Sequence, residues 1–269
     1  METSKIAIIG SGNIGLSLAK GLVKGNYSKA EQITLTRRNA QNLAEYAKQG
    51  FATTSNNVEA AKNASIVILA VLPQQLKNIL AEIKPVVTAD QLIISVIAGV
   101  SCADIAAGLP SGVKIVRAMP NTAISIQQSM TCIATASAGR EEMDTVHAMF
   151  NTVGSVAEIH EDLMTSATAL CSCGTAFFLR AIRAASQGGV EIGFHAEEAL
   201  RMAVQTAKGA ADLLLLNSSH PEHEIDKVTS PKGCTIVGLN EMEHQGFSSS
   251  LIKGIKLSAL KASSLYSKE

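Results

Sequence analysis

The chain has 269 residues, of which 46% are hydrophobic, 17% charged and 3% aromatic, and its 23 basic residues balance its 23 acidic ones. At about 150 residues per domain, this length predicts one large domain or two smaller ones with a packed core. The charged share lies below the average of about 25%, which excludes a charge-rich disordered chain. The zero net charge excludes a globally basic nucleic-acid binder.

The first half of the chain alternates between apolar strands and helices. Strands are expected at residues 5–10, 32–36, 51–53, 65–71, 92–97 and 114–118, and helices at 14–25, 39–49, 57–62, 74–83 and 101–107. Strands that are apolar throughout and separated by helices predict a parallel sheet covered on both faces. A strand at 130–135, a helix at 140–152 and a strand at 155–158 extend the pattern, so a first domain is expected over residues 1–159.

The second half, residues 160–269, is expected to be helical. Helices are predicted at 162–187, with a stop at Gly188 and Gly189, and at 195–216, 235–244 and 249–264. Leu163, Leu170 and Phe178 are spread around the first of these helices, which must then be buried on several sides. About 110 residues do not easily surround such helices, so we predict an obligate homodimer. The fold class is α/β, with an all-α dimerisation domain following the sheet.

The start of the chain and its cysteines predict a cytoplasmic location. A strand begins close to Met1, so no signal peptide is expected, and the apolar runs 65–72 and 92–100 are shorter than the roughly 18 residues of a membrane span. The five cysteines are odd in number and lack a C-x-x-C pair, which predicts reduced thiols. His220 and His223 fall in an expected loop, so no metal site is predicted.

A glycine-rich loop directly follows the first predicted strand. Its residues Gly10, Ser11, Gly12, Asn13, Ile14 and Gly15 match the pattern G-x-G-x-x-G. Because the loop joins a strand to a helix, it is typical of a Rossmann dinucleotide site. Gly10 would permit the tight turn, Gly12 the approach of a pyrophosphate, and Gly15 the packing of the helix on the strand. The helix N-terminus would offer N–H groups to the phosphates.

The end of the second strand indicates which dinucleotide binds. An NAD site uses a carboxylate there, but residues 35–39 contain none. Arg37 and Arg38, with a neighbouring hydroxyl at Thr36, offer donors to a 2′-phosphate instead. NADPH is therefore predicted as the cofactor, with NADH as the alternative.

Three further loops at the carboxyl ends of strands are expected to line the cofactor crevice, at residues 70–74, 96–99 and 118–122. For residues 119–122, a turn locked by Pro120 is the alternative. Asn57 either approaches the adenosine side of the cofactor or caps the helix that follows it.

One loop of the helical half is a candidate anion-binding site. Residues 228–235 form a polar turn that contains Pro231 and Gly233 and opens a helix. Its exposed N–H groups would hold a carboxylate, and Ser230 and Thr235 add hydroxyls. An ordinary helix cap without a ligand is an equally good interpretation.

These segments together resemble the pyrroline-5-carboxylate reductase family along nearly the whole chain. The resemblance rests on residues 10–15, 70–74, 117–123, 161–178, 188–193 and 228–235 and on the terminal Gly246-Phe247. It implies a Rossmann domain followed by a helical dimerisation domain, often assembled into rings of dimers. It also implies reduction of 1-pyrroline-5-carboxylate, a small imino acid, to L-proline with NAD(P)H.

The resemblance also implies roles for individual residues. Phosphate and ribose contacts fall to Ser11, Gly12, Asn13, Ile14, Arg37 and Asn57, and the nicotinamide end is flanked by Ala70, Val71, Leu72, Pro73, Ile97 and Ala98. The amides of Gly233, Cys234 and Thr235 hold the substrate carboxylate. The Thr235 hydroxyl reaches the ring nitrogen, and Glu161 lies nearby. In the family this loop faces the cofactor of the partner subunit.

The chain departs from the family pattern at several positions. These are Leu72, Ala123, Cys171, Cys173, Thr175, Lys227 and Lys232. Lys232 replaces a glycine and would either pair with the substrate carboxylate or obstruct the amides. Two alternatives to the family reaction follow: a reductase of a related cyclic imino acid, and a catalytically impaired NADPH-binding paralogue.

Overall fold

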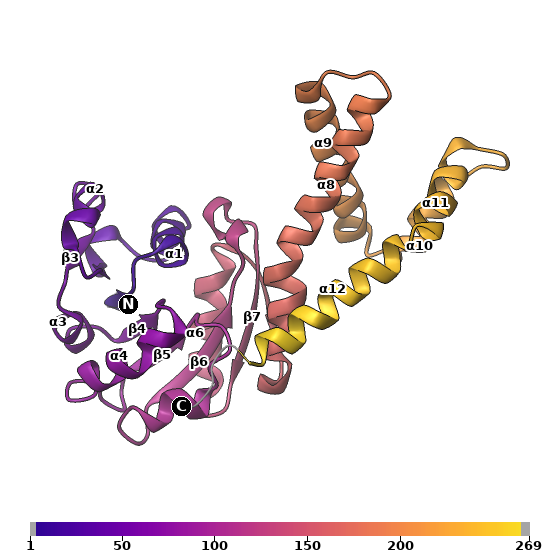
Figure 1. The fold of residues 1–269 in the computed structure, drawn as a ribbon. Coiled ribbons are helices and arrows are strands. Elements are labelled where there is room, and N and C mark those ends of the chain that lie inside the picture. The colour runs from indigo at the N-terminus through magenta and orange to yellow at the C-terminus, as the bar shows by residue number, and fades with distance from the viewer. Residues whose placement is uncertain (1–3, 265–269) are drawn as a thin grey trace. The chain divides into compact units, whose positions relative to one another are not determined.

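The computed structural model describes residues 4–264, which divide into two compact units (Figure 1). The first, here called the sheet unit, comprises residues 4–173 together with 258–264. The second, the helical unit, comprises Gly174–Leu257. The sheet unit therefore contains the predicted cofactor loop, and the helical unit contains the predicted substrate loop.

One sheet with the strand order β3-β2-β1-β4-β5-β6-β7-β8 forms the sheet unit. Its strands are β1 (Ile6–Ile9), β2 (Ile33–Thr36), β3 (Ala52–Thr54), β4 (Ile66–Leu69), β5 (Leu92–Ser95), β6 (Lys114–Met119), β7 (Ser129–Thr135) and β8 (Gly154–Glu158). Its helices include α1 (Asn13–Lys24), α2 (Ala44–Ala47), α3 (Asn57–Lys62), α4 (Leu76–Ile83), α5 (Cys102–Ala107) and α6 (Arg140–Asn151). The sheet reverses direction of growth at β1, between β2 and β4, where dinucleotides bind in such folds.

The alternation of side chains along β1 explains why both faces of the sheet are covered. Ile6 and Ile8 pack into a core with α1 and α6, whereas Ala7 and Ile9 pack into a second core with α3, α4 and α5. Successive strand residues point to opposite faces, so a fully apolar strand has to be covered on both. The predicted α/β class is confirmed.

The strand β7 departs from the predicted parallel sheet because it pairs antiparallel with β6. Residues 120–128 alone connect the two strands and form a 3₁₀ turn at Thr122–Ile126. A parallel return requires a crossover of about a dozen residues or more, so the short connection reverses the chain. The next strand, β8, is again parallel to β7, because α6 provides the crossover.

The helix predicted at 39–49 is shorter and less regular than expected. A 3₁₀ turn at Ala40–Leu43 precedes the single α-helical turn α2. The Asn39 side chain accepts a hydrogen bond from the Gln41 N–H at 3.0 Å, so the chain is capped locally. Asparagine competes in this way with regular helix formation.

The long helix predicted at 162–187 is a series of helical segments. A 3₁₀ turn at Glu161–Leu163, the helix α7 (Met164–Ala167) and a π-helical segment at Thr168–Cys173 lead into α8 (Gly174–Glu191). By length and composition the stretch Glu161–Glu191 is apolar enough to cross a membrane, contrary to the expectation from the shorter apolar runs. A helix that buries its apolar faces against protein meets the same criteria, so this likeness is weak evidence for a span.

The stop predicted at Gly188 and Gly189 is wrong, because α8 continues to Glu191. A Cβ atom on Gly189 would lie 2.9 Å from the Cβ of Ala199, on the neighbouring helix α9 (Ala196–Asn217). The absence of a side chain at Gly189 therefore allows α8 and α9 to approach, which a sequence-local argument interprets as a break. Figure 1 shows these two helices side by side.

The remaining helices are α10 (Pro221–Lys227), α11 (Cys234–His244) and α12 (Phe247–Ala262). The first of these was expected to be a loop, and that expectation is wrong. Pro221 occupies the first helical position, which suits proline because its missing N–H has no helical partner there. The ring nitrogen Nδ1 of His220 accepts the Glu222 N–H at 3.3 Å, so this histidine caps the helix.

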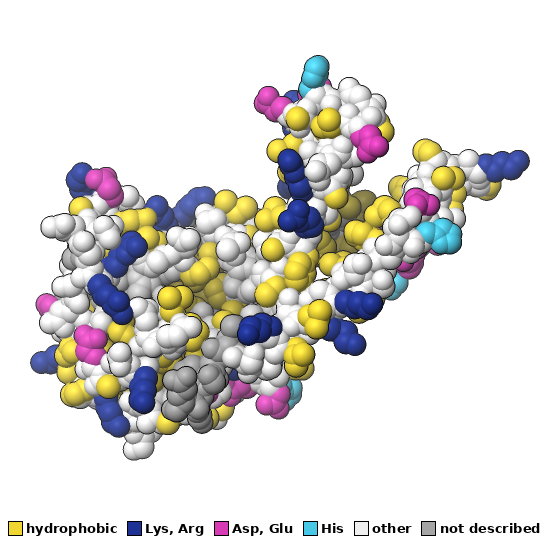
Figure 2. Space-filling view, viewed as in Figure 1, with side chains coloured by type: hydrophobic (Ala, Val, Ile, Leu, Met, Phe, Trp, Pro, Cys, Tyr) yellow, Lys and Arg dark blue, Asp and Glu magenta, His cyan; other side chains and the backbone are white. Residues whose placement is uncertain are grey.

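Large apolar side chains lie exposed on the helical unit (Figure 2). Phe178 on α8 is 63% exposed, and Leu216 on α9 is 84% exposed. Leu179, Leu215, Val237, Ile252 and Leu257 belong to the same class. Exposure of so many large apolar side chains on one unit is typical of a surface that binds another protein.

Candidate cofactor pocket and carboxylate-binding loop

At two positions of the glycine loop, the space available admits only glycine. Gly10 has a φ of 94°, and a Cβ there would lie 2.5 Å from the Ala70 carbonyl oxygen. A Cβ on Gly15 would lie 2.6 Å from the Gly10 carbonyl oxygen, so α1 packs directly on the loop. A Cβ on Gly12 would meet no atom within 4 Å, so the Gly12 backbone faces open space. Gly12 also begins α1 without a side-chain cap, which leaves the first N–H groups of that helix free for an anion.

A pocket of about 610 Å³ opens beside this loop. It is lined by eleven of the predicted cofactor residues: Gly10, Ser11, Gly12, Asn13, Ile14, Arg37, Arg38, Asn57, Ala70, Val71 and Leu72. Val96, from the predicted loop 96–99, also lines it. The sequence did not single out the wall residues Ile9, Asn39, Asn42, Gln75 and Ile79. Gly15, Pro73, Ile97 and Ala98 are not part of the lining. Ile97 is 2% exposed and packs in the core, and the neighbouring Val96 takes the place expected for it.

A buried hydroxyl at the loop supports the fit of a phosphate group. Ser11 is 1% exposed, and its Oγ has no hydrogen-bond partner within residues 4–264. Its N–H donates to the Thr36 carbonyl oxygen at 2.9 Å, which fixes the residue against β2. An unsatisfied buried hydroxyl is costly, and an anion bound at the start of α1 would satisfy it. The residues present therefore fit a dinucleotide cofactor.

The two arginines at the end of β2 are exposed, and their guanidinium groups have no partner among the described residues. The Thr36 hydroxyl, in contrast, is used inside the protein. It accepts the Gly10 N–H at 3.4 Å and donates to Asn57 Oδ1 at 2.6 Å. The expectation that this hydroxyl helps to bind a 2′-phosphate is therefore wrong, and the cationic part of the expected site reduces to Arg37 and Arg38.

Asn57 was expected either to cap a helix or to approach the cofactor. The cap is Asn56, whose side chain accepts the Glu59 N–H at 3.0 Å. Asn57 lines the pocket, and its Nδ2 donates to Glu82 Oε2 at 3.0 Å. Its amide is thus held from both ends, by Thr36 and by Glu82, and the capping interpretation no longer applies to it.

The turn after β6 is tied to the π-helical segment. Asn121 donates from Nδ2 to the Cys171 carbonyl oxygen at 3.1 Å, and the Ser172 hydroxyl donates to the Pro120 carbonyl oxygen at 2.9 Å. The Oδ1 of Asn121 accepts the Ala123 N–H at 3.0 Å and so caps the 3₁₀ turn. Residues 118–122 do not line the cofactor pocket, and the alternative of a locked turn describes them better.

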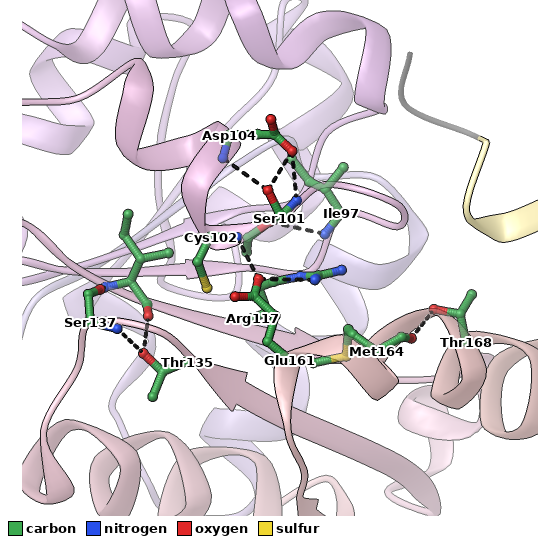
Figure 3. A network of polar contacts seen from close by, with 12 residues as sticks. Ile97, Ser101, Cys102, Asp104, Arg117, Thr135, Ser137, Glu161, Met164 and Thr168 are labelled. Atoms are coloured by element: carbon green, nitrogen blue, oxygen red, sulfur yellow. Dashed lines mark hydrogen bonds and ion pairs between the residues drawn. The ribbon is translucent and has the colours of Figure 1, made fainter. Parts of the chain in front are cut away.

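Glu161 has defined partners in the sheet unit (Figure 3). Its Oε1 accepts the Cys102 N–H at 2.6 Å and a guanidinium N–H of Arg117 at 3.2 Å. Burial raises the pKa of this carboxyl, but the bonds from Cys102 and Arg117 outweigh it and hold the pKa below its ordinary value. Burial and the nearby Glu161 charge raise the pKa of the Cys102 thiol to about 12, so this cysteine stays protonated. Arg117 is buried, and no partner of its Nε lies within residues 4–264.

The loop 228–235 ends at the start of α11. Gly233 is the N-terminal cap of that helix and makes no side-chain bond to it, so the N–H groups of the first turn lack a cap from that side chain. The Gly233 N–H donates to the Ser230 carbonyl oxygen at 2.9 Å. A Cβ at this glycine would lie 2.6 Å from the Ser230 Oγ, so the tight turn favours glycine. Cys234 is exposed and Thr235 is half-buried.

Lys232 has a φ of 58°, in the left-handed region that favours glycine. The family pattern has a glycine at this position. Here the backbone keeps the conformation that suits glycine, although the residue is a lysine. The Lys232 side chain is exposed. Within residues 4–264 no cluster of three or more His, Cys, Asp or Glu side chains is arranged to hold a metal ion.

Comparisons with known proteins identify both halves of the chain. Residues 161–265 match the family model described as pyrroline-5-carboxylate reductase dimerisation. Residues 5–99 match the model described as NADP oxidoreductase, coenzyme F420-dependent. The second match covers the glycine loop, the two arginines and Asn57.

Two relatives from Dictyostelium discoideum are 50% identical to the chain, pyrroline-5-carboxylate reductases 1 and 2. The alignments cover 98% and 97% of this chain, but only 50% of the first relative against 93% of the second. The chain thus spans about half the length of the first relative. Among solved structures, the Plasmodium falciparum pyrroline carboxylate reductase with NADP bound has a TM-score of 0.90 at 27% identity, with 99% of this chain and 100% of that chain covered. The Coxiella burnetii pyrroline-5-carboxylate reductase reaches 0.92 at 29% identity, with the same coverage of each chain.

Proposed function

Because the chain belongs to the pyrroline-5-carboxylate reductase family, we propose that it reduces the C=N bond of 1-pyrroline-5-carboxylate to L-proline with NADPH. The observation that carries this proposal in the structure is the pocket on the glycine loop. Its lining includes the buried Ser11 hydroxyl and two arginines, and neither the hydroxyl nor the guanidinium groups have a partner among the described residues. NADPH, when bound, supplies the hydride. NADH is the weaker alternative, since no carboxylate lines the pocket.

The cofactor residues divide by the part of the dinucleotide that they would hold. The Ser11 hydroxyl and the N–H groups of Asn13 and Ile14 would bind the pyrophosphate, which can come close to the backbone because Gly12 has no side chain. The N–H groups of Ser11 and Gly12 already donate to the carbonyl oxygens of Thr36 and Gly10. Gly10 and Gly15 shape the loop around the pyrophosphate. Arg37 and Arg38 would bind the 2′-phosphate, and Asn57 the adenosine side. The apolar end of the pocket, at Ala70, Val71 and Leu72 with Pro73, Ile97 and Ala98 behind them, would flank the nicotinamide.

The substrate is proposed to bind through its carboxylate. The N–H groups of Cys234 and Thr235 at the uncapped start of α11 would hold this anion. Gly233 precedes them as the helix cap, and its own N–H already donates to the Ser230 carbonyl oxygen. The Thr235 hydroxyl would then hydrogen-bond the ring nitrogen, and Glu161 would lie nearby, fixed by Arg117 and the Cys102 N–H. A protonated C=N accepts a hydride readily, so the site has to position the ring rather than to supply a strong acid or base.

We propose that the active protein is a homodimer that divides into functional domains at residues 1–159 and 160–269. The match of the dimerisation model over residues 161–265 and the exposed apolar side chains of the helical unit support this assembly. Assembly of the dimers into a higher ring, and a cytoplasmic location, are further parts of the proposal. In the dimer, the loop 228–235 of one subunit would meet the cofactor of its partner.

The proposal is tested by measuring NADPH consumption and L-proline formation with purified protein. We expect turnover with 1-pyrroline-5-carboxylate that exceeds turnover with the corresponding six-membered cyclic imine, and a higher kcat/KM with NADPH than with NADH. The variant Thr235→Ala should lose about 10- to 100-fold in kcat, because the ring nitrogen loses its hydrogen bond in the transition state.

Each other outcome selects a different function. A preference for the six-membered imine would identify a reductase of a related cyclic imino acid. NADPH binding without turnover of any imine would identify an impaired paralogue. In that case Lys232, next to the start of α11, would be the first residue to test as an obstruction of the amides. Unaltered turnover in Thr235→Ala would remove Thr235 from the mechanism.

A further inference from the structure

Two cysteines from distant parts of the sheet unit lie next to each other. Cys132 on β7 and Cys171 in the π-helical segment are 39 residues apart in sequence, yet their Sγ atoms are 3.8 Å apart. Both residues belong to the same compact unit. A disulfide between them would bring the two sulfurs to about 2.05 Å.

The surroundings of the two thiols differ. Cys132 is 4% exposed and belongs to a small core with Met119, Ala134 and Met164. Cys171 packs against this core from its edge and is only half-buried. The pair therefore combines one thiol near the surface with one buried directly behind it. Such a partly exposed thiol with a second cysteine within reach is the arrangement found in redox-sensing pairs.

The hydrogen bond between the thiols makes Cys171 the more reactive of the two. The contact with the Cys132 side chain lowers the pKa of Cys171 to about 7. The same bond, together with burial, raises the pKa of Cys132 well above its ordinary value. Since the thiolate is the nucleophile, the half-buried Cys171 reacts first and the buried Cys132 second.

The backbone holds Cys171 in place for this reaction. Its carbonyl oxygen accepts the Asn121 amide, and the next residue, Ser172, donates to the Pro120 carbonyl oxygen. These two bonds tie the π-helical segment to the turn between β6 and β7. The pair is thus positioned by two tethers that do not involve the sulfur atoms, so it does not depend on the flexibility of a loop.

We propose that Cys132 and Cys171 form a reversible disulfide within the subunit when the protein meets a hydroperoxide. The Cys171 thiolate attacks the peroxide O–O bond, giving a sulfenic acid, while the leaving oxygen takes up a proton and departs as water or an alcohol. The Cys132 thiol then attacks the Cys171 sulfur, the S–S bond forms and a second molecule of water leaves. The two thiols lose two electrons and the peroxide gains them. A dithiol reverses the reaction by exchange.

The disulfide would join β7 to the segment that leads into the helical unit. It closes a long loop, which restricts the unfolded chain, and it lies beside the turn held by Asn121. We therefore expect the oxidised protein to have a Tm several degrees higher than the reduced protein. This proposal is independent of the proposed activity, and its primary measurement does not involve turnover.

The experiment treats the full chain with hydrogen peroxide at stoichiometric amounts, blocks free thiols, and maps peptides without reduction. The expected result is a peptide pair joined through Cys132 and Cys171, in a band that migrates as one chain on a non-reducing gel and disappears with dithiothreitol. Cys173→Ser is the matched control, since it removes a neighbouring half-buried thiol and should leave the crosslink intact. Cys171→Ser should abolish both the crosslink and the Tm rise.

Three outcomes would overturn the proposal. They are sulfinic acid at Cys171 with Cys132 still reduced, a crosslink between two subunits, and a Cys132–Cys171 peptide that persists in dithiothreitol. Because Cys132 is buried, where a serine hydroxyl would lack a partner, Cys132→Ala serves as the second variant. In it, Cys171 should stop at the sulfenic acid, which a dimedone adduct would reveal.

Discussion

The sheet unit and the helical unit differ in how far their large apolar side chains are buried within one chain. In the sheet unit, Ile6, Ile8, Leu18 and Phe150 are essentially inaccessible, and two cores cover both faces of the strands. In the helical unit, side chains of the same kind, such as Phe178, lie in solvent in the single chain. The central sheet is covered on both faces within one chain, whereas the exposed apolar side chains of the helical half need a second copy to cover them. The predictions below test this contrast.

The largest effect is expected from a charge on the exposed apolar surface of α8. Phe178→Asp places a carboxylate on an apolar interface from which water has to be excluded. We expect it to weaken dimerisation by at least about 3 kcal/mol. Sedimentation equilibrium of the wild-type protein should give twice the 28.1 kDa chain mass, and the variant should shift toward one chain mass. Gln49→Asp, the same charge change on an exposed residue of the sheet unit, is the control. A wild-type protein that sediments as a monomer at micromolar concentration would contradict the claim that the helical half needs a second copy.

The next largest effect concerns the sheet unit alone. Glu161→Gln removes the charge that pairs with the buried Arg117 guanidinium, and we expect a loss of about 3 kcal/mol in the free energy of unfolding. Urea denaturation measures this loss. Glu31→Gln, at an exposed residue without an ion pair among the described residues, should change stability by less than about 0.5 kcal/mol.

The same ion pair gives a pH dependence with a defined sign. The pKa of Glu161 is lower in the folded chain than the ordinary value of 4.5, so its contribution to stability is fully present above that value. As the pH falls through the folded pKa, the carboxylate is protonated and the contribution is lost. Wild-type and Glu161→Gln stabilities should therefore converge as the solution is acidified. If the stabilities of the two proteins kept a constant difference down to the pH of acid unfolding, the ion pair would not be the source of the pH dependence.

A smaller effect is expected at the cofactor pocket. Arg37→Ala should weaken NADPH binding about 10- to 30-fold, or about 1.4 to 2 kcal/mol, because a charge-assisted contact to the 2′-phosphate is lost. NADH binding should stay unchanged, since NADH lacks that phosphate. Lys29→Ala, which removes a cation just before the other end of β2, is the matched control. Equal losses for NADPH and NADH, measured by fluorescence titration, would assign Arg37 to another part of the cofactor.

The smallest effect is expected at the substrate loop. Lys232→Gly should raise stability by up to about 1 kcal/mol, because the left-handed backbone at this residue suits glycine better than lysine. Lys227→Gly, in the helix α10, should lower stability by about 1 kcal/mol. Chemical denaturation compares the two variants. A stability loss in Lys232→Gly would mean that the lysine side chain makes contacts that offset its backbone strain.

The sequence predicted the parts of the fold that depend on neighbouring residues. The glycine loop, the apolar strands and the arginines at the end of β2 were all found in this way, because each is defined by residues a few positions apart. The same local reasoning assigned the helix cap to Asn57 rather than Asn56, and it did not foresee that Asn57 is held by Thr36 and Glu82. Those partners are 21 and 25 residues away.

The errors of the sequence analysis have one physical origin, which is tertiary context. Gly189 looks like a helix stop until α9 is placed against it, and the antiparallel β7 follows from a connection too short for a crossover. The expected position of Glu161 near the substrate stays a prediction, but its bonds to Cys102 and Arg117 were not foreseen, because they appear only once the strands are assembled. The pairing of Cys132 with Cys171 is equally invisible in the sequence, where nothing relates the two cysteines.

The measurement that tests the central contrast most directly is the activity of mixed dimers. Gly12→Val fills open space and should block the pyrophosphate without disturbing the fold, and Thr235→Asp places an anion where the substrate carboxylate has to bind. Each variant alone should be inactive. If the loop of one subunit serves the cofactor of its partner, co-refolded mixtures recover about a quarter of wild-type activity, because half of the dimers contain one intact site. Mixtures as inactive as the two parents would contradict a site shared between two copies of the chain.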